Sequence, residues 1–567
     1  MKKGKAEACM EFCFFLILLS VYMHGIGKLF GPIRFPDEFG YWSHGARLLG
    51  YDWNAVSGIH PYYSFGYGML MAPLLKWCSN PVVLYRIAVS INFILMVWCY
   101  VILKKILGIL FHAPVCPFMT LFSGLAVLYS SFMVYAQTTL PEILLVLLYL
   151  LLIVSVLMFF QKPSAYYMGA MAAISAGLYF VHMRTLGIGI ALWLVLVWEA
   201  IRNKEIRAYV LTGALAYGIL IIAGVGYKNS YMDEIYNVSG GSLAALNDFS
   251  GQIEKLGKLT TVKGMADFIC SLGGKLFYLG SATGGLFYWG IMSVYSMTAC
   301  GIRYKMAAAR FILLSALFTL GIVSLFMIDT PRADGVIYGR YSEILLPILI
   351  GTGLTAMVHS PGLWKGSFGI ICFQSVMMYL VNWKISSTGA YGIYRHSIPA
   401  VAYALEFSSN RVFAFTKNVY LGGVFFGLTM AGVLWIVRRR ERFLYLAFVW
   451  AVIQWGLGMD VCSRMNYKYN RDNYQDIIIA EQIKDMAGEY ERIVFLYSDG
   501  YGYVDLLQFC LKEIPVHVLK EQYGSIRAVT QQDIVVTSRW DIFSKELGQT
   551  YGTKRESAHF EVYYIEK

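Results

Sequence analysis

Apolar runs of about 20 residues, the length that a helix needs to cross a bilayer, recur along most of this chain. A backbone in the hydrocarbon layer has no water to bond its N–H and C=O groups, so only helices and closed barrels can cross it. A barrel would show short segments of alternating polarity. The runs are long and continuous, so we expect a polytopic α-helical membrane protein.

The composition agrees with this class. Hydrophobic residues make up 57% of the chain and charged residues 14%, against about 25% charged in soluble domains. The net charge of +12 would suit a polyanion, but Lys and Arg cluster in short connections between apolar runs, where they set orientation. We therefore expect membrane lipids and no nucleic acid as partners. The 10 cysteines show no CxxC and no metal-ligand spacing, which is typical of small buried hydrophobes.

About thirteen spans are predicted. They lie near residues 8–30, 82–103, 115–135, 140–160, 165–181, 185–200, 207–226, 285–302, 309–328, 341–358, 366–384, 418–437 and 442–459. If the N-terminus is cytoplasmic, nearly every short basic connection falls on the cytoplasmic face, as the positive-inside rule requires. An odd number of spans places the C-terminus outside. The basic N-terminus lacks a small-residue cleavage site after its apolar run, so we expect an uncleaved first span.

Two regions follow from these spans. Residues 1–459 form a transmembrane domain with long outer segments at 31–81, 227–284 and 385–417, the first of them rich in the aromatic residues that favour a membrane interface. Residues 460–567 are predicted to form a small extracytoplasmic α/β domain, with a helix at 473–488, strands at 492–497, 514–519, 533–538 and 560–566, and a helix at 503–511. No internal repeat is evident, which counts against transporter folds.

Two adjacent carboxylates, Asp37 and Glu38, follow Pro36 in the first outer segment. Burial among aromatic residues would disfavour charge and raise at least one pKa, which would make a usable general base or a cation ligand. A plainer interpretation is that both acids lie in the first turn of a helix, and the two interpretations are compatible. Further along, His60 and Tyr62 are candidates for substrate contacts, although helix packing at the interface would also account for them.

Three polar residues mark the outer ends of later spans. Glu142 begins the fourth span, where it either complements the helix dipole or takes part in function. His182 and Arg184 occupy the short outer turn after the fifth span. An arginine on that side breaks the positive-inside trend, so it either reaches toward lipid phosphates or binds an anionic substrate phosphate.

The outer connection at 329–343 holds three acids and two arginines in fifteen residues. A solvated turn would explain Arg332 and Asp334. It explains Arg340 less well, because this residue enters the tenth span together with Tyr341 and Glu343. The planar fork of arginine suits phosphate recognition, so Arg340 is a candidate phosphate ligand, and Asp334 and Tyr341 are candidates for substrate contacts.

All these polar sets share the outer face, whereas the connections on the other face are simply basic. Cytosolic ATP and nucleotide sugars are absent from the outer side, so a reaction there needs another activated donor. A lipid-linked phosphate with its head group at the interface would meet that need.

The sequence resembles the family-C (GT-C) glycosyltransferases, the group that includes protein O-mannosyltransferases and aminoarabinose transferases. The resemblance covers most of the chain and rests on Pro36-Asp37-Glu38, His60-Pro61-Tyr62, Glu142 and Arg184-Thr185-Leu186-Gly187. It implies that Asp37, with Glu38 as its neighbour, deprotonates an acceptor hydroxyl, which attacks the anomeric carbon of a polyprenyl-phosphate sugar with inversion. Arg184 and Arg340, with His182, would stabilise the departing phosphate.

The resemblance leaves several points open. It requires no cofactor, and a divalent cation at Asp37, Glu38 or Glu142 is allowed but not demanded by a monophosphate donor. The acceptor could be a lipid, a glycan or a protein. A transporter or flippase, a non-catalytic component of surface-glycan assembly and a diphosphate-dependent polymerase or ligase stay as alternatives, although a transporter would place charges near the middle of its spans, where few occur. The compact loops favour a bacterial plasma membrane.

Overall fold

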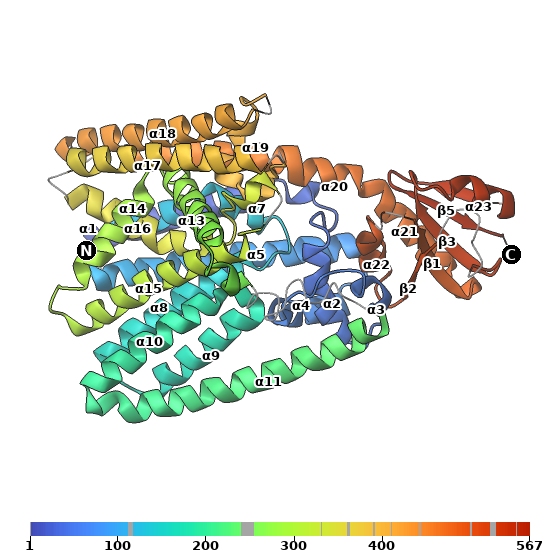
Figure 1. Ribbon diagram of the computed structural model, residues 1–567, viewed down its shortest axis with the longest axis horizontal. Helices are drawn as coiled ribbons and strands as arrows, with labels where there is room; N and C mark the ends of the chain where they lie inside the picture. Colours follow the sequence, from blue (N-terminus) through green and yellow to red (C-terminus); the bar gives the residue numbers. More distant parts are fainter. Residues whose placement is uncertain are drawn as a thin grey trace.

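The protein is described by a computed structural model in which long helices lie side by side and a small sheet domain projects from one end (Figure 1). It describes residues 2–111, 117–239, 255–329, 332–359, 363–388, 392–409, 411–440, 444–498, 500, 502–521, 529–551 and 553–566. Parts of the predicted outer segments, 240–254 and 389–391, lie outside the described residues.

Every predicted span contains a helix. The helices in these spans are α1 (Lys2–Met23), α5 (Pro81–Leu110), α6 (Pro117–Val127), α7 (Ser130–Ala136), α8 (Glu142–Gln161), α9 (Ala165–Val181), α10 (Leu186–Arg202), α11 (Arg207–Ser239), α14 (Leu286–Met297), α15 (Arg303–Phe326), α16 (Leu346–His359), α17 (Leu363–Ser387), α18 (Val412–Arg440) and α19 (Leu444–Val461). Within the described ranges, eight helices are long and apolar enough to cross a membrane, or nine if the bent pair α6–α7 is one span. The helical membrane class is confirmed, and the number thirteen stays a prediction.

One helix lies where only an outer connection was expected. Helix α13 (Val262–Ala282) falls inside the segment 227–284 and packs against α15, α17 and α18. Its charged residues interrupt the apolar pattern that marks a span. One of them, Lys275, is fully buried and donates hydrogen bonds to Ser271 Oγ and to the carbonyl oxygens of Gly335 and Val336. The buried charge that interrupts the apolar pattern of α13 therefore bonds the connection before α16 to this helix.

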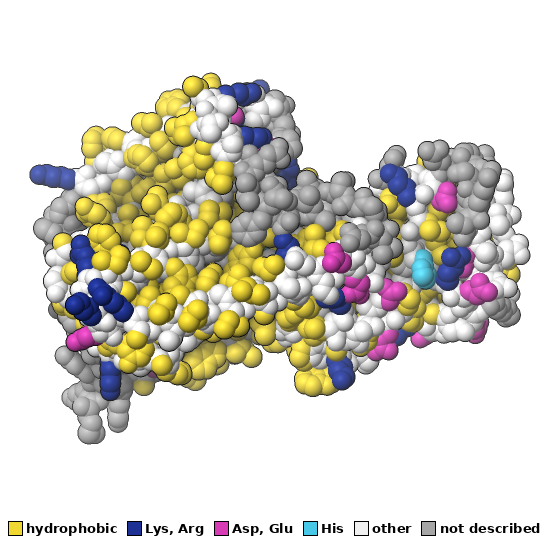
Figure 2. All heavy atoms as spheres, turned by 60° about the horizontal axis from the view of Figure 1, so that its bottom comes forward, with side chains coloured by type: hydrophobic (Ala, Val, Ile, Leu, Met, Phe, Trp, Pro, Cys, Tyr) yellow, Lys and Arg dark blue, Asp and Glu magenta, His cyan; other side chains and the backbone are white. Residues whose placement is uncertain are grey.

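The surface separates the two regions. Hydrophobic side chains cover the helical part in a broad belt, whereas the sheet domain shows mainly polar and charged side chains on the same face (Figure 2). Such a belt is what a lipid environment requires, and its exposed side chains include Leu211, Ile219, Ile222, Phe368 and Phe425.

Three helices occupy the first outer segment: α2 (Asp37–Leu48), α3 (Asn54–Ser57) and α4 (Phe65–Trp77). Helices α2 and α4 cross closely, because a Cβ at Gly68 would lie 1.9 Å from the carbonyl oxygen of Tyr41. Only glycine fits there. This crossing fixes the direction in which the first turn of α2, with Asp37 and Glu38, enters the protein.

The C-terminal domain contains a five-stranded sheet in the order β2-β1-β3-β5-β4. Its elements are β1 (Arg492–Tyr497), α22 (Val504–Leu511), β2 (Val516–Lys520), β3 (Asp533–Ser538), α23 (Ser544–Thr550), β4 (Thr553–Glu556) and β5 (Phe560–Tyr564), and α20 (Lys468–Asp472) and α21 (Tyr474–Met486) join it to α19. Strand β1 runs parallel to β2 and β3, and β5 is antiparallel to β3 and β4. The four strands expected from the sequence are present; polar β4 was not predicted.

The sheet domain docks on the first outer segment through α22 (Figure 1). His60 Nε2 lies 2.5 Å from Asp505 Oδ1, with both side chains almost fully buried, and Trp53 Nε1 donates to the carbonyl oxygen of Lys512 at 2.7 Å. The ring of Phe509 meets Trp42 edge-on at 5.5 Å. The domain therefore supports the helix that begins with Asp37.

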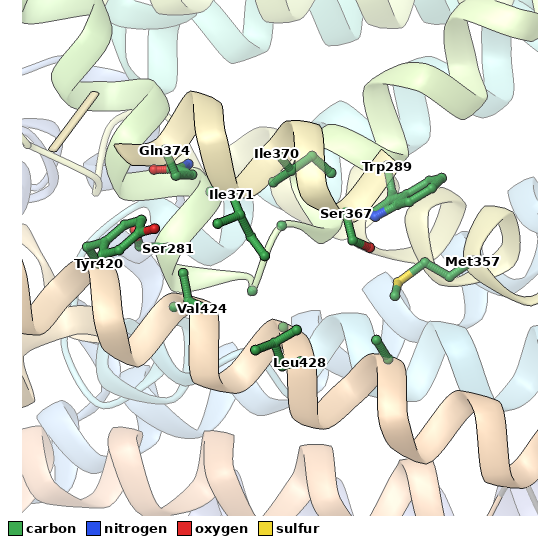
Figure 3. A pocket seen from close by; sticks show the side chains of 16 residues that line it. Ser281, Trp289, Met357, Ser367, Ile370, Ile371, Gln374, Tyr420, Val424 and Leu428 are labelled. Carbon is green, nitrogen blue, oxygen red and sulfur yellow. The ribbon is translucent and has the colours of Figure 1, made fainter. Parts of the chain in front are cut away.

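One small cavity lies between α13, α17 and α18, where glycines bring the helices together (Figure 3). Its volume is about 40 Å³, which holds very few water molecules. It is too small for a sugar or a lipid head group, so the functional site must lie elsewhere.

Candidate functional site

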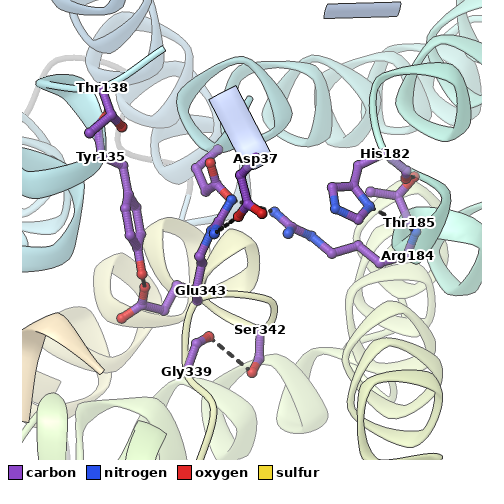
Figure 4. A network of polar contacts seen from close by, with 11 residues as sticks. Asp37, Tyr135, Thr138, His182, Arg184, Thr185, Gly339, Ser342 and Glu343 are labelled. Atoms are coloured by element: carbon purple, nitrogen blue, oxygen red, sulfur yellow. Dashed lines mark hydrogen bonds and ion pairs between the residues drawn. The ribbon is translucent and has the colours of Figure 1, made fainter. Parts of the chain in front are cut away.

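Four charged residues from distant parts of the chain form one network at one end of the helices (Figure 4). Arg340 Nη1 lies 2.6 Å from Asp37 Oδ2, and Arg340 Nε lies 2.6 Å from Glu142 Oε1. Arg184 Nη2 lies 3.2 Å from the same Glu142 oxygen. The structure therefore brings together Asp37, Glu142, Arg184 and Arg340, which the sequence placed on one face as separate candidates.

Asp37 is the first residue of α2, and its side chain is 28% exposed. Burial would raise the pKa of Asp37, but the charge and hydrogen bond of Arg340 hold that pKa below its ordinary value of 3.8, with help from His396 and from the Tyr63 hydroxyl, which donates to Oδ1 at 2.9 Å. A rise in pKa, which burial alone would predict, therefore does not occur at Asp37. The carboxylate is ionised at neutral pH and can accept a proton.

Glu38 has a different environment from its neighbour. It is fully buried, and its Oε1 accepts hydrogen bonds from the backbone N–H groups of Ile33 and Arg34, both at 2.9 Å. Its Oε2 accepts hydrogen bonds from the Tyr85 hydroxyl and from the backbone N–H and hydroxyl of Thr139, at 2.6–2.9 Å. Five donors satisfy a carboxylate that offers about four lone-pair sites. Glu38 thus fixes the loop before α2 to the segment before α8.

Arg184 carries buried donors that no described residue satisfies. The residue is 8% exposed, and its Nη2 donates to Glu142; Nε and Nη1 lack a hydrogen-bond partner within the described part of the chain. The ring of Tyr341 lies 4.4 Å from the guanidinium carbon. An unsatisfied buried donor costs about 1–3 kcal/mol, and more when it is charged. This cost would be relieved by an anionic ligand.

His182 lies beside Arg184 in the turn before α10 and accepts a hydrogen bond on Nδ1 from the Arg184 backbone N–H at 3.3 Å. Burial, together with the charges of Arg184 and Arg340, holds the pKa of His182 well below its ordinary value. The ring is therefore neutral at physiological pH and adds no charge for a phosphate, although it can still form a hydrogen bond.

Two cavities meet at Asp37 and Tyr341. The apolar cavity has a volume of about 490 Å³ and is lined by Arg184, Tyr62 and the apolar side chains Leu186, Ile190, Ile322, Val323, Leu325 and Phe326 of α10 and α15. The polar cavity has a volume of about 740 Å³ and is lined by Arg34, Arg332, Arg395, Arg464, His396 and several tyrosines. Asp37 and Tyr341 line both cavities, so one carboxylate faces an apolar and a polar compartment at once.

The remaining sequence candidates are more dispersed. Tyr62 lines the apolar cavity, whereas His60 contacts Asp505 in the docked domain. Asp334 is fully buried and binds Arg332 at 3.0 Å, so it contributes to the polar cavity through that arginine.

Sequence reasoning missed several residues of this region. Arg34 and His396 line the polar cavity. Arg34 stands three residues before Asp37 on the outer side, so the departure from the positive-inside trend that drew attention to Arg184 could also have indicated it. No comparable signal marks His396.

Glu343 was noticed in the sequence, but its environment was not expected. It is 1% exposed and accepts hydrogen bonds from four hydroxyl groups, those of Tyr129, Ser131, Tyr135 and Tyr278, at 2.5–2.8 Å. These hydroxyls belong to α13 and to the segment around α7. They anchor the turn at 339–343 that carries Arg340, and no sequence spacing could have brought them together.

A cation does not fit the carboxylates proposed for it. Glu38 is saturated by five donors, Asp37 is paired with Arg340, and Glu142 is paired with two arginines. Among the described residues, no three His, Cys, Asp or Glu side chains are grouped in a way that could hold a metal ion. We therefore derive no catalytic step through a metal.

Neither a protein-family model nor a curated protein sequence matches the chain. Crystal structures of ArnT from Cupriavidus metallidurans do match in fold. The apo structure has a TM-score of 0.55 at 15% sequence identity, and the structure bound to undecaprenyl phosphate has a TM-score of 0.54 at 16% identity. Each match covers 97% of this chain and 97% of the ArnT chain. The resemblance to GT-C aminoarabinose transferases is thus confirmed as a likeness of fold.

Proposed function

We propose that this chain is a membrane glycosyltransferase that moves a sugar from a polyprenyl-phosphate donor to an acceptor hydroxyl on the extracytoplasmic side. One observation carries the proposal: an apolar cavity is lined both by buried Arg184, whose Nε and Nη1 have no hydrogen-bond partner among the described residues, and by the ionised carboxylate of Asp37. A lipid chain suits the apolar walls, a phosphate suits the arginine, and a general base suits the aspartate.

The donor is assigned to the apolar cavity. Its walls come from α10 and α15 and consist of aliphatic and aromatic side chains, which suit an isoprenoid chain. The fold is that of a protein crystallised with undecaprenyl phosphate. In this proposal the lipid phosphate binds Nε and Nη1 of Arg184, and the neutral ring of His182 donates a hydrogen bond to it.

The acceptor is assigned to the polar cavity, which reaches Asp37 from the other side. Asp37 takes the proton of the acceptor hydroxyl while the oxygen bonds to the anomeric carbon. The bond from that carbon to the phosphate oxygen breaks, and the electron pair leaves with the lipid phosphate. Arg184 then stabilises the charge that develops on the leaving oxygen.

Arg340 holds the base in place in this proposal. It is 2% exposed and bonds both Asp37 and Glu142 at 2.6 Å, so its role differs from the phosphate contact expected from the sequence. Glu142 in turn bonds Arg184. Glu142 thereby orients both arginines: Arg184, which binds the donor phosphate in this proposal, and Arg340, which bonds the base.

The proposal predicts the behaviour of Asp37→Asn. Purified protein in lipid vesicles would be given polyprenyl-phosphate donors that carry a panel of radiolabelled sugars, together with an envelope extract as acceptor. Release of polyprenyl phosphate is the readout. A general base contributes about 10²- to 10⁴-fold, so the variant is expected to lose activity by that factor while it still inserts and folds.

Asp52→Asn is the matched control, because Asp52 is an exposed acid of the same outer segment and caps only the N–H of Asn54. It is expected to react at the wild-type rate. Full activity of Asp37→Asn would contradict the assignment of the base.

A further inference from the structure

Three aromatic rings meet on the sheet domain beside the polar cavity. Tyr503 follows β1, Trp540 follows β3 and His559 precedes β5. The rings of Tyr503 and His559 are stacked, with centroids 3.7 Å apart and an angle of 20°. Trp540 meets His559 edge-on at 5.6 Å and 84°. We name Tyr503, Trp540 and His559 the aromatic platform.

The platform occupies the edge of the sheet where ligands bind in open α/β folds. Strands β1 and β3 are parallel neighbours, but the chain passes through β2 on the far side of β1 before it enters β3. The connections therefore diverge at the carboxyl ends of β1 and β3, and ligands in such sheets bind at that point of divergence. Strand β5 is antiparallel to β3, so His559 lies at the same edge.

Hydrogen bonds hold the loops of the platform together. The backbone N–H and hydroxyl of Ser498, after β1, donate to the Asp541 carboxylate at 3.1 and 2.9 Å. The Arg539 N–H donates to the carbonyl oxygen of His559 at 3.0 Å, and His559 Nδ1 lies 2.5 Å from Asp476 Oδ2. The rings are thus ordered before any ligand arrives, which reduces the entropic cost of binding.

The platform borders the polar cavity through Tyr503. Tyr503 lines that cavity together with Asp37, and its ring meets Phe35 edge-on at 5.9 Å. Phe35 stands two residues before Asp37. A ligand that rests on the platform can therefore extend toward the proposed base without leaving the cavity wall.

The chemistry of the platform fits a saccharide. Trp540 is 67% exposed, and its neighbours Arg539 and Asp541 are charged. The C–H faces of a pyranose ring pack on aromatic rings, while its hydroxyl groups bond to polar side chains nearby. A lipid chain fits less well, because the sheet domain lies beyond the hydrophobic belt of the helices (Figure 2).

We propose that the aromatic platform is a saccharide-binding subsite that holds the glycan part of the acceptor. The inference rests on the proposed function, since it takes the polar cavity as the acceptor side. It gives the sheet domain a role in acceptor binding in addition to its support of α2.

Saturation-transfer NMR on the full chain in lipid nanodiscs tests the subsite. The probe is the mixture of oligosaccharides released by mild acid from the envelope of the cells that carry this chain. Wild-type protein is expected to transfer saturation to the sugar ring protons. Trp540→Ala is expected to bind about tenfold more weakly, which corresponds to about 1.4 kcal/mol, and Trp540→Phe, which keeps a ring, is expected to fall between them.

Trp77→Ala is the matched control, because Trp77 is 77% exposed at the end of α4 and lies outside the platform. It is expected to bind like the wild type. Absence of transfer from the wild type, or equal affinities for wild type and Trp540→Ala, would overturn the subsite. Asp37→Asn is expected to keep saccharide binding, so a failure of the proposed reaction and a failure of the subsite appear in different assays.

Discussion

Among single side chains, the neighbours Asp37 and Glu38 show how burial and partners separate two adjacent carboxylates. Glu38 receives five hydrogen bonds, whereas Asp37 is bonded by Arg340 and Tyr63 and still lines both cavities. The sequence indicated this pair and its neighbourhood. It could not tell which of the two is accessible, because three of the five donors to Glu38 come from Tyr85 and Thr139, far along the chain.

The bond from Arg340 to Asp37 predicts a change in pH dependence. Arg340 lowers the pKa of Asp37, so the base stays ionised as the pH falls. In Arg340→Gln the effect of burial on Asp37 is opposed only by His396 and the Tyr63 hydroxyl, so the pKa of Asp37 rises. The acidic limb of the pH–rate profile is expected to move about 1–3 pH units higher, the usual influence of an adjacent arginine on an aspartate.

Arg340→Lys keeps the positive charge but loses the planar, bidentate guanidinium. Its acidic limb is expected to move by a smaller number of pH units. Arg47→Gln is the control, because Arg47 lies on the same helix and pairs with Glu234 rather than with Asp37. Thermal unfolding in detergent identifies variants that lose activity by unfolding. If the acidic limb of folded Arg340→Gln lies at the same pH as that of the wild type, the claim that Arg340 lowers the pKa of the base is contradicted.

At the level of helices and strands, local sequence patterns predicted the elements themselves well. They predicted the contacts between these elements poorly. The apolar runs and the β-branched runs correspond to helices and to four of the five strands, because hydropathy and β-propensity act over a few residues. Helix α13 was missed because buried Lys275 interrupts its apolar pattern. The hydroxyl groups around Glu343 and the docking of α22 were missed because they join residues far apart in the chain.

The docking of α22 can be tested at His60. In His60→Ala, Asp505 loses the only hydrogen-bond partner that the described residues give to its carboxylate, at a cost of about 1–3 kcal/mol. Backbone amides of α22 and of the segment before α4 are expected to exchange hydrogen faster. His517→Ala, in half-exposed β2, serves as the control. Unchanged exchange in α22 would contradict a supporting role for this contact.

In the whole molecule, the apolar cavity is lined mainly by α10, α15 and the first outer segment, and the polar cavity by the loop before α2, the connections around Tyr338 and Arg395, and Tyr503 of the sheet domain. A lipid-linked donor and a polar acceptor could therefore reach Asp37 from different surroundings. Composition predicted the membrane class, which the helical architecture confirms; the extracytoplasmic position of the site, expected from charge placement, stays a prediction. Composition and charge placement could not predict two cavities that share one carboxylate, because cavities arise from packing between distant helices.

The orientation expected from the placement of Lys and Arg can be tested with reporter-enzyme fusions. Alkaline phosphatase fused after Lys567 is expected to be active, since it needs the extracytoplasmic side, and a fusion at Asn203 in the basic connection before α11 is expected to be inactive. The reverse pattern would place Asp37 in the cytoplasm and remove the reason for a lipid-linked donor.

The most direct test of the proposed function is the affinity of the protein for undecaprenyl phosphate. Wild type, Arg184→Ala and the control Arg202→Ala, at the opposite end of α10, would be compared in nanodiscs by native mass spectrometry. Loss of charged hydrogen bonds to the phosphate is expected to weaken binding to Arg184→Ala at least about tenfold, or about 1.4 kcal/mol, with Arg202→Ala unchanged. Undecaprenol, which lacks the phosphate, is expected to bind wild type and Arg184→Ala equally. Equal affinity of wild type and Arg184→Ala for the phosphate would contradict the assignment of the donor site.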